Sequence, residues 1–209
     1  MKLYDCKPAP NPRRARMFMA EKGIEIPTIQ VDLRAGEHLK PAYRAINPQC
    51  VVPYLVLDDG AGIGEVVAIW RYLEETHPTP QLLGVDPEDK AIVAMWQHRM
   101  ELDGFQAVGE AFRNSTPGFK GRALAGPHDY EQIPALAERG KARTLDFFDD
   151  IDKRLGESEF IAGPRFTAAD IDAFVAIEFA RWIKLAVPAA CKNVTRWHNA
   201  VSARPSASA

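Results

Sequence analysis

The sequence predicts a chain of two unlike halves: an α/β N-terminal half over residues 1–78 and an all-helical C-terminal half over residues 89–209, joined by a linker at 79–88. Strand-like and helix-like patterns alternate in the first half, whereas only helical periodicity follows the linker. The linker is rich in proline and glycine, which favour turns over regular elements. With 209 residues, of which 46% are hydrophobic, the chain can bury a sizeable core.

The α/β half is predicted to begin with a short strand at Lys2–Asp5 and a helix with clear end signals. Asn11 is the expected N-cap residue and Pro12 the first helical residue. Gly23 is expected to end the helix, because glycine adopts the left-handed conformation of a C′ residue at little cost. A stripe at helical spacing consists of Ala15, Phe18, Met19 and Lys22, and its apolar members are predicted to be core.

The rest of the α/β half is predicted to be a strand, a hairpin and a helix. The strand at 25–33 is interrupted by Pro27, which predicts an edge position because proline has no N–H to donate. Strands at 52–57 and 61–63 flank Asp58-Asp59-Gly60, a strong hairpin signal. The helix expected at 64–75 offers for burial Val67, Ile69, Trp70 and Leu73.

The C-terminal half shows helical periodicity in four segments: 89–112, 133–155, 167–183 and 189–201. Residues 114–130 contain several prolines and glycines and are predicted to form a loop. The third helix has a specific start signal, because Thr167 and Asp170 can exchange the hydrogen bonds of a capping box and Phe166 can pack on Ile171. This signal is structural rather than chemical.

Composition excludes several classes of function. The formal net charge of −2 gives no electrostatic case for nucleic acid, and the basic cluster at 13–16 is interpreted as a solvated helix face. No apolar run approaches the roughly 18 residues that cross a bilayer, and no signal-peptide pattern is present, so no membrane partner is expected. Cys6, Cys50 and Cys191 lack the spacing of a disulfide framework, which is typical of reduced thiols in the cytoplasm. No metal site is predicted.

The segment from Val52 to Glu65 predicts a site for a small peptide. Proline at the start of a buried strand cannot donate to the ladder, so Pro53 favours a special backbone such as a cis bond. Val52 would then present its N–H and C=O to a ligand, as in strand addition. Glu65, at the start of the next helix, is placed to meet the charged end of such a peptide.

Several segments together resemble the glutathione transferase superfamily over essentially the whole chain. They are LYD, APNPRRARMFMAEKGIEIP, GEH at 36–38, NPQCVVPYLVLDDG at 47–60, GEVVAIWRYLEETHP at 64–78 and FIAGPRFTAADIDAF at 160–174. IKLAVP and WHNAVSARPS are most similar to a fungal and bacterial subgroup. The resemblance implies a thioredoxin-like N-terminal domain, a helical C-terminal domain of the transferase type, glutathione as co-substrate and usually a homodimer.

The resemblance also implies roles around the predicted peptide site. Val52 would pair its backbone with the cysteinyl unit of glutathione, and Glu65 would hold the γ-glutamyl end. His38 and Lys40 match positions that reach toward the glycyl carboxylate, where a cation suits an anion. For His38 a solvated loop residue is the alternative. Cys50 stands where some relatives carry a histidine toward the glycyl end.

Three departures from the family pattern bear on catalysis. Val66 stands where the family usually has a serine that grips the γ-glutamyl carboxylate, so a hydroxyl is lost. Cys6 replaces the catalytic hydroxyl expected just after the first strand. Gly109 and Arg113 fall where the subgroup offers serine and histidine to position a water near the thiol.

The resemblance implies a transferase that conjugates glutathione to small hydrophobic electrophiles. Because a free thiol has a pKa near ~8.5, the thiolate needs stabilisation, which the positive N-terminus of the first helix, at Pro12 or Arg13, is expected to supply. Arg113 could add charge or hold an acidic second substrate. The expected second-substrate pocket consists of Phe105, Gly109, Phe112 and Arg113, with Phe119 and Trp182 as further candidates and core packing as the alternative.

Cys6 supports a rival hypothesis. A thiol beside a helix N-terminus is expected to have a lowered pKa and could become glutathionylated, as in thiol transferases and dehydroascorbate reductases. Against this, Lys7 breaks the usual Cys-Pro context, and Cys6 can be an inert replacement for serine. A third hypothesis is a non-catalytic ligand carrier on the same fold, because Val66 removes a glutathione contact.

Overall fold

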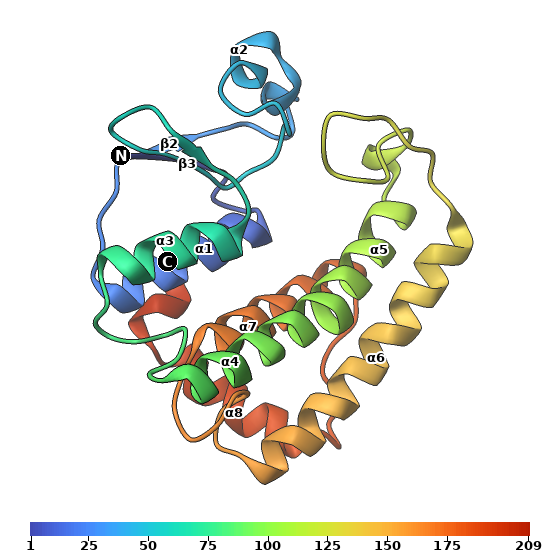
Figure 1. Cartoon of the computed structure of the whole chain (residues 1–209). Coiled ribbons are helices and arrows are strands. Elements are labelled where there is room, and N and C mark those ends of the chain that lie inside the picture. Colours follow the sequence, from blue (N-terminus) through green and yellow to red (C-terminus); the bar gives the residue numbers. More distant parts are fainter. The chain divides into compact units, whose positions relative to one another are not determined.

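The computed structural model describes all residues from 1 to 209 and divides the chain into two compact units (Figure 1). Unit 1 comprises residues 1–80, 124–129 and 209, and unit 2 comprises residues 81–123 and 130–208. Unit 1 holds the β-sheet, and the regular elements of unit 2 are all helices, which confirms the predicted fold class. None of the helices is both long enough and apolar enough to cross a bilayer.

Unit 1 is a four-stranded sheet with two long helices. Its elements are β1 Lys2–Asp5, α1 Pro10–Lys22, β2 Thr28–Gln30, the 3-10 helix η1 Glu37–Leu39, α2 Pro41–Arg44, β3 Tyr54–Val56, β4 Gly62–Ile63 and α3 Val66–Thr76. The strand order is β2-β1-β3-β4, with β1 and β2 parallel and the other pairs antiparallel. The edge position predicted for the second strand is therefore confirmed, although β2 is shorter than the predicted 25–33.

The start of α1 differs from the prediction, whereas its end agrees. The helix begins at Pro10 with Ala9 as N-cap, so Asn11 is not the cap and Pro12 is not the first helical residue. Pro10 already has the fixed φ of a first helical position, and this favours a helix start two residues earlier than predicted. Gly23 ends the helix at φ 65°, and the N–H of Ile24 donates to the carbonyl of Met19 at 2.9 Å, as in a Schellman motif.

Two observations define the packing of α1 against α3. The rings of Phe18 and Trp70 stack with centroids 5.1 Å apart. The buried ammonium of Lys22 lies 2.7 Å from the carboxylate of Glu74 and donates to the carbonyl of His77 at 2.6 Å. A buried charge needs such partners, and this set ties the C-terminal ends of both helices together.

The buried face of α3 agrees with the prediction at three positions and differs at one. Val67 is 52% exposed, so its predicted burial is wrong, and Val66 is buried in its place. The helix begins at Val66, and positions 66, 69, 70 and 73 follow the spacing of one helical face. Ile69, Trp70 and Leu73 are buried, as predicted.

Unit 2 consists of helices. They are α4 Pro87–Arg99, the π-helix η2 Met100–Phe105, α5 Gln106–Ser115, the 3-10 helix η3 Pro117–Phe119, α6 Pro134–Glu157, α7 Ala168–Ala180, the 3-10 helix η4 Arg181–Ile183, α8 Lys192–Ser202 and the 3-10 helix η5 Pro205–Ser208. The four predicted helical segments are present, but the first is divided by the π-helix and runs on to Ser115. The segment at 114–130 breaks the helical pattern, as predicted.

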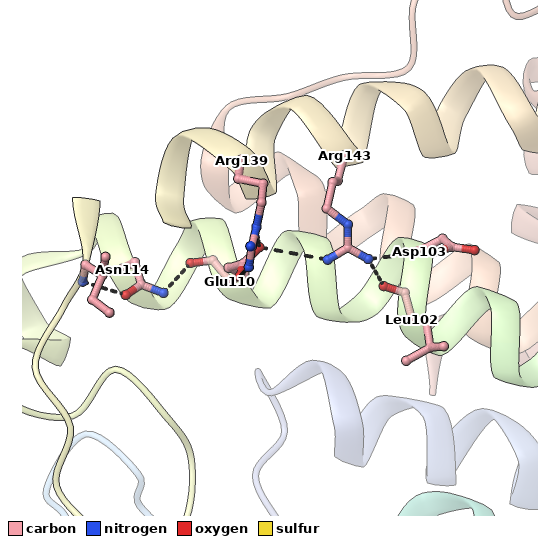
Figure 2. A network of polar contacts seen from close by, with 7 residues as sticks. Leu102, Asp103, Glu110, Asn114, Arg139 and Arg143 are labelled. Atoms are coloured by element: carbon pink, nitrogen blue, oxygen red, sulfur yellow. Dashed lines mark hydrogen bonds and ion pairs between the residues drawn. The ribbon is translucent and has the colours of Figure 1, made fainter. Parts of the chain in front are cut away.

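Helices α5 and α6 approach closely at Gly140, where a Cβ would lie 2.6 Å from the carbonyl oxygen of Ala107. Figure 2 shows the polar network beside this contact. Arg139 forms an ion pair with Glu110, and Arg143 donates to the carbonyl of Leu102 at 2.6 Å. Arg143 thereby joins α6 to the π-helix η2.

The capping box predicted at the start of α7 is confirmed. The N–H of Thr167 donates to Oδ2 of Asp170 at 2.9 Å. Oδ1 of Asp170 accepts from the N–H of Ile161 and from Nε1 of Trp197, both at 2.9 Å. Burial raises the pKa of Asp170 to about 6, although these hydrogen bonds act in the opposite direction.

Candidate active site

The predicted peptide edge lies in the loop before β3. The Val52–Pro53 bond is cis, which confirms the expectation of a special backbone at this proline. The carbonyl of Val51 accepts from the hydroxyl of Tyr43 at 2.7 Å and from Nδ2 of Asn47 at 2.9 Å. The N–H and C=O of Val52 have no partner within the chain. The loop is therefore held by residue 51, while residue 52 keeps both backbone groups for a ligand.

Cys6 lies at the end of β1 and shares a buried cluster with Val52. The other buried members of the cluster are Val31 and Tyr43. The carbonyl of Cys6 accepts from the N–H of Ala9 at 2.8 Å, and this turn leads into α1. The fold thus brings together two predicted site residues that are 46 positions apart in the sequence.

The pKa of the Cys6 thiol is raised, which contradicts the lowered pKa expected beside a helix N-terminus. Burial is the main cause, and the carboxylates of Asp5 and Asp32 add to it. Backbone hydrogen bonds at Leu33 and Ala9 lower the pKa, but by less. Desolvation disfavours the charged thiolate and here outweighs these hydrogen bonds. Cys6 is consequently a protonated thiol at neutral pH.

The start of α3 presents backbone donors. Glu65 is the N-cap residue and is exposed, with φ 62° and ψ 132°. A non-glycine residue at positive φ costs on the order of 1–3 kcal/mol and is frequent at functional sites. The N–H groups of Val66 and Val67 have no acceptor in the chain, because they belong to the first turn of the helix. Such a helix end favours a carboxylate.

The three remaining peptide-site candidates lie in or beside the segment that holds η1 and α2. His38 is half-buried within η1, and Lys40 is an exposed residue at the N-cap of α2. Cys50 is buried with φ 55°, and its sulfur donates to the carbonyl of Pro48 at 3.5 Å. The Cys50 side chain therefore faces its own segment, and Cys6, Cys50 and Cys191 are all free thiols.

The basic cluster at 13–16 is not a solvated face, contrary to the interpretation from sequence. Arg14 is 2% exposed, donates to Oδ1 of Asn11 at 2.9 Å and lies over the ring of Trp70. Arg16 donates to Oδ1 of Asp5 at 2.5 Å and to the carbonyl of Lys7 at 2.8 Å. The N–H of Arg13 begins the hydrogen-bond ladder of α1 at the carbonyl of Ala9. Sequence could not reveal this, because Asp5, Lys7 and Trp70 are not sequence neighbours of these arginines.

In unit 2, four aromatic candidates gather around a residue that the sequence did not single out, Phe179. Phe112 lies 5.4 Å, Trp182 5.4 Å and Phe105 5.8 Å from Phe179 between ring centroids, and Phe119 lies 5.1 Å from Phe112. Trp182 is 47% exposed, and Phe112 and Phe119 are half-buried. These five residues form an aromatic cluster that is partly open to solvent. A Cβ at Gly109 would just touch the ring of Phe179, at 4.0 Å.

Arg113 anchors the loop that follows α5. Its Nε donates to the carbonyl of Ala123 at 3.0 Å, and its NH2 group donates to the carbonyl of Arg122 at 2.6 Å. The guanidinium lies 4.4 Å from the ring centroid of Phe119. Burial, with the nearby charge of Arg122, lowers the pKa of Arg113 to about 10, so it stays charged at neutral pH. Arg113 thus contacts the backbone of the loop and the aromatic cluster.

A sheet in the β2-β1-β3-β4 order, with a cis-proline loop beside the residue that follows β1, defines a thioredoxin-like domain, and a helical unit continues the chain. Comparison with known proteins gives the family. The domain described as "Glutathione S-transferase, N-terminal domain" matches residues 9–76, and "Glutathione S-transferase, C-terminal domain" matches residues 115–205.

Similar proteins agree with this assignment over the whole chain. Glutathione S-transferase 2 of Saccharomyces cerevisiae is 34% identical over 99% of this chain and 87% of its own. The crystal structure of Gtt2 from the same yeast has a TM-score of 0.90 at 33% identity, covering 99% of this chain and 98% of that one. A glutathione S-transferase domain-containing protein of Marinobacter aquaeolei VT8 has a TM-score of 0.91 at 37% identity over 99% of both chains. The chain belongs to the glutathione S-transferase family, a family of enzymes, and the likeness to its Gtt2 members is confirmed.

Proposed function

We propose that this enzyme transfers the thiolate of glutathione to small hydrophobic electrophiles and that residues 1–78 form its glutathione-binding domain. One observation carries the proposal: Val52, whose backbone N–H and C=O have no partner in the chain, shares a buried cluster with Cys6 at the end of β1. An extended tripeptide that pairs with Val52 would place its cysteinyl unit beside this cluster.

The two ends of glutathione would meet complementary groups in unit 1. The γ-glutamyl end would bind at Glu65 and at the N–H groups that begin α3. The glycyl carboxylate would meet His38 and the ammonium of Lys40, whereas Cys50 is buried and donates to the carbonyl of Pro48. Val66 supplies an N–H but no hydroxyl. A hydrogen bond to a charged group contributes about 1.5–3 kcal/mol, so affinity is expected to be about tenfold or more weaker than with serine.

The thiolate would be stabilised by the N-terminus of α1 and by Cys6. The positive end of the helix dipole acts on an anion near the residues from Ala9 to Arg13, including Pro12. The raised pKa of Cys6 keeps its S–H, which can donate a weak hydrogen bond to the glutathione sulfur as a hydroxyl would. This favours the reading of Cys6 as a serine replacement over the thiol-transferase alternative, which needs a Cys6 thiolate.

The electrophile would bind on the aromatic cluster of unit 2. Phe112, Phe119 and Trp182 present partly exposed ring surface, and Gly109 adds no side chain beside Phe179. Aromatic rings suit planar, apolar molecules. Arg113 would act indirectly, because it donates to the backbone of the loop and lies over the ring of Phe119.

Calorimetric titration with glutathione, followed by conjugation assays on a panel of electrophiles, tests the proposal. We expect binding at millimolar strength or tighter and slow conjugation of aromatic electrophiles. Absence of conjugation across the panel at saturating glutathione would refute the transferase. A ligand carrier would instead bind apolar molecules without turnover.

Two further measurements address the alternatives. Mass spectrometry after treatment with oxidised glutathione should leave Cys6 unmodified at neutral pH, whereas one glutathione on Cys6 would support the thiol transferase. Light scattering should give twice the mass of one chain, because we propose a homodimer.

A further inference from the structure

The residue after Cys6 is held on both sides by side chains that converge on one buried carboxylate. The N–H of Lys7 donates to Oε1 of Gln30 at 2.9 Å, and the carbonyl of Lys7 accepts from Nη2 of Arg16 at 2.8 Å. Gln30 donates through Nε2 to Oδ2 of Asp5, and Arg16 donates through Nη1 to Oδ1 of Asp5, both at 2.5 Å. Asp5, Arg16, Lys7 and Gln30 therefore form a closed ring of four hydrogen bonds, the Asp5 ring.

The sheet and α1 bring the members of the Asp5 ring together. Asp5 and Gln30 are register partners in the parallel pair of β1 and β2, so their side chains lie next to each other. Arg16 comes from α1, two turns after the helix begins. Asp5 is 1% exposed, and a buried carboxylate requires such donors. The ring thus joins β1, β2 and α1 at the point where the chain leaves the sheet.

Stabilisation of the sheet alone does not account for the hydrogen bonds that Arg16 and Gln30 make to the Lys7 backbone. Arg16 and Gln30 could each satisfy Asp5 without touching Lys7, yet each uses a second polar group on the Lys7 backbone. Nε of Arg16 is buried without a hydrogen-bond partner, which is a cost to folding. The side chain of Lys7 is exposed, so the ring grips only its backbone.

The Asp5 ring needs a residue at position 7 that has a backbone N–H, and Lys7 provides it. A proline at position 7 would have no N–H to donate to Gln30. Because Lys7 stands in place of the proline of a Cys-Pro sequence, its N–H supplies one of the four hydrogen bonds. The turn from Cys6 to Ala9 closes on the other side of Lys7, through the 2.8 Å hydrogen bond between the N–H of Ala9 and the carbonyl of Cys6.

We propose that Asp5, Arg16 and Gln30 are positioning residues that fix the Cys6–Ala9 segment, and with it the sulfur-binding end of the glutathione site, in the geometry that transfer requires. The inference rests on the proposed function, because the sulfur-binding end is assigned there. The residues act through the backbone of Lys7 and do not touch the substrate.

Gln30→Leu tests the Asp5 ring, because it removes two of the four hydrogen bonds at an exposed side chain. Thr28→Val is the matched control on the same face of β2, and its hydroxyl contacts only the carbonyl of Ile26. The first readout is the rate at which a maleimide modifies Cys6, followed by peptide mass spectrometry. The second is kcat and KM for conjugation.

We expect Gln30→Leu to speed the labelling of Cys6 about tenfold, as two lost hydrogen bonds loosen the segment, and to lower kcat at least about fivefold with KM for the electrophile unchanged. Thr28→Val should match the wild-type protein. Arg16→Met, if it folds, should give the same pattern. A Gln30→Leu protein equal to the control in either readout would overturn the proposal. A wild-type protein without conjugation would refute the proposed function, while the labelling rates would still show whether the Asp5 ring holds the segment.

Discussion

Asp170 allows a sharp test of how burial and hydrogen bonding compete at one carboxylate. The pKa of Asp170 is about 6 in the folded protein, against an ordinary value of 3.8, because burial outweighs the donors of Ile161, Thr167 and Trp197. The folded state then binds the proton more tightly than the unfolded chain. The sign follows from linkage: the contribution of Asp170 to stability is complete below pH 3.8 and is lost as the pH rises through about 6.

The magnitude follows from the same two pKa values. Over its full range the shift corresponds to about 3 kcal/mol, and between pH 4.5 and pH 7 the contribution falls by about 2 kcal/mol. Other carboxyl groups also titrate in this window, so the wild-type curve alone does not isolate Asp170. Asp170→Asn removes the titration and keeps the size of the side chain. The difference between the two proteins therefore isolates the Asp170 contribution.

Urea unfolding of both proteins at pH 4.5 and pH 7, followed by far-UV circular dichroism, measures the effect. The advantage of pH 4.5 over pH 7 should be about 2 kcal/mol larger for the wild-type protein than for Asp170→Asn, with equal m-values. A double difference of zero would refute the reasoning. A double difference of the opposite sign would show that the hydrogen-bond donors lower the pKa of Asp170 by more than burial raises it.

Three further perturbations address the site and the packing. Val66→Ser should tighten glutathione binding about tenfold in calorimetric titration, because it adds a hydroxyl at the start of α3. Val67→Ser, on the exposed face of the helix, is the control. Equal affinities of the two variants would argue against a carboxylate at this helix end. Cys6→Ser should retain conjugation within about tenfold of the wild-type rate, whereas Cys6→Ala should lose more, and a loss in both variants would favour a nucleophilic thiol. Gly140→Ala should lower the unfolding free energy by about 1–3 kcal/mol in urea titration, because its Cβ would lie 2.6 Å from the Ala107 carbonyl, while Lys141→Ala should not.

Features encoded by neighbouring residues could be predicted from sequence. The capping box needs only Thr167 and Asp170, and the end of α1 needs only Gly23, so each signal lies within one helical turn. The cis bond before Pro53 is likewise a local property of a proline at a strand entrance. These predictions agree with the structure because no distant contact competes with them.

Features that depend on distant partners could not be predicted. The sequence predicts a solvated face for Arg14 and Arg16, because it does not show that Asp5, Lys7 and Trp70 are their partners. The Asp5 ring requires the register of the parallel strands, which the sequence does not state. The π-helix has no local signature either. Asn11 illustrates a different reason for a wrong prediction. It is a favourable N-cap residue, but Pro10 before it already begins the helix.

The raised pKa of Cys6 connects these observations to catalysis. A helix N-terminus attracts whichever thiolate lies beside it, and two sulfurs would meet here when glutathione binds. Asp5 and Asp32 add negative charge near Cys6, and burial removes its water, so ionisation of the Cys6 thiol is disfavoured. Asp5 therefore has two effects from one carboxylate: it orders the segment that follows Cys6, and it biases Cys6 toward the protonated form. In the transferase that we propose, the helix end would then act on the sulfur of glutathione, whereas a thiol transferase would need Cys6 itself as the thiolate.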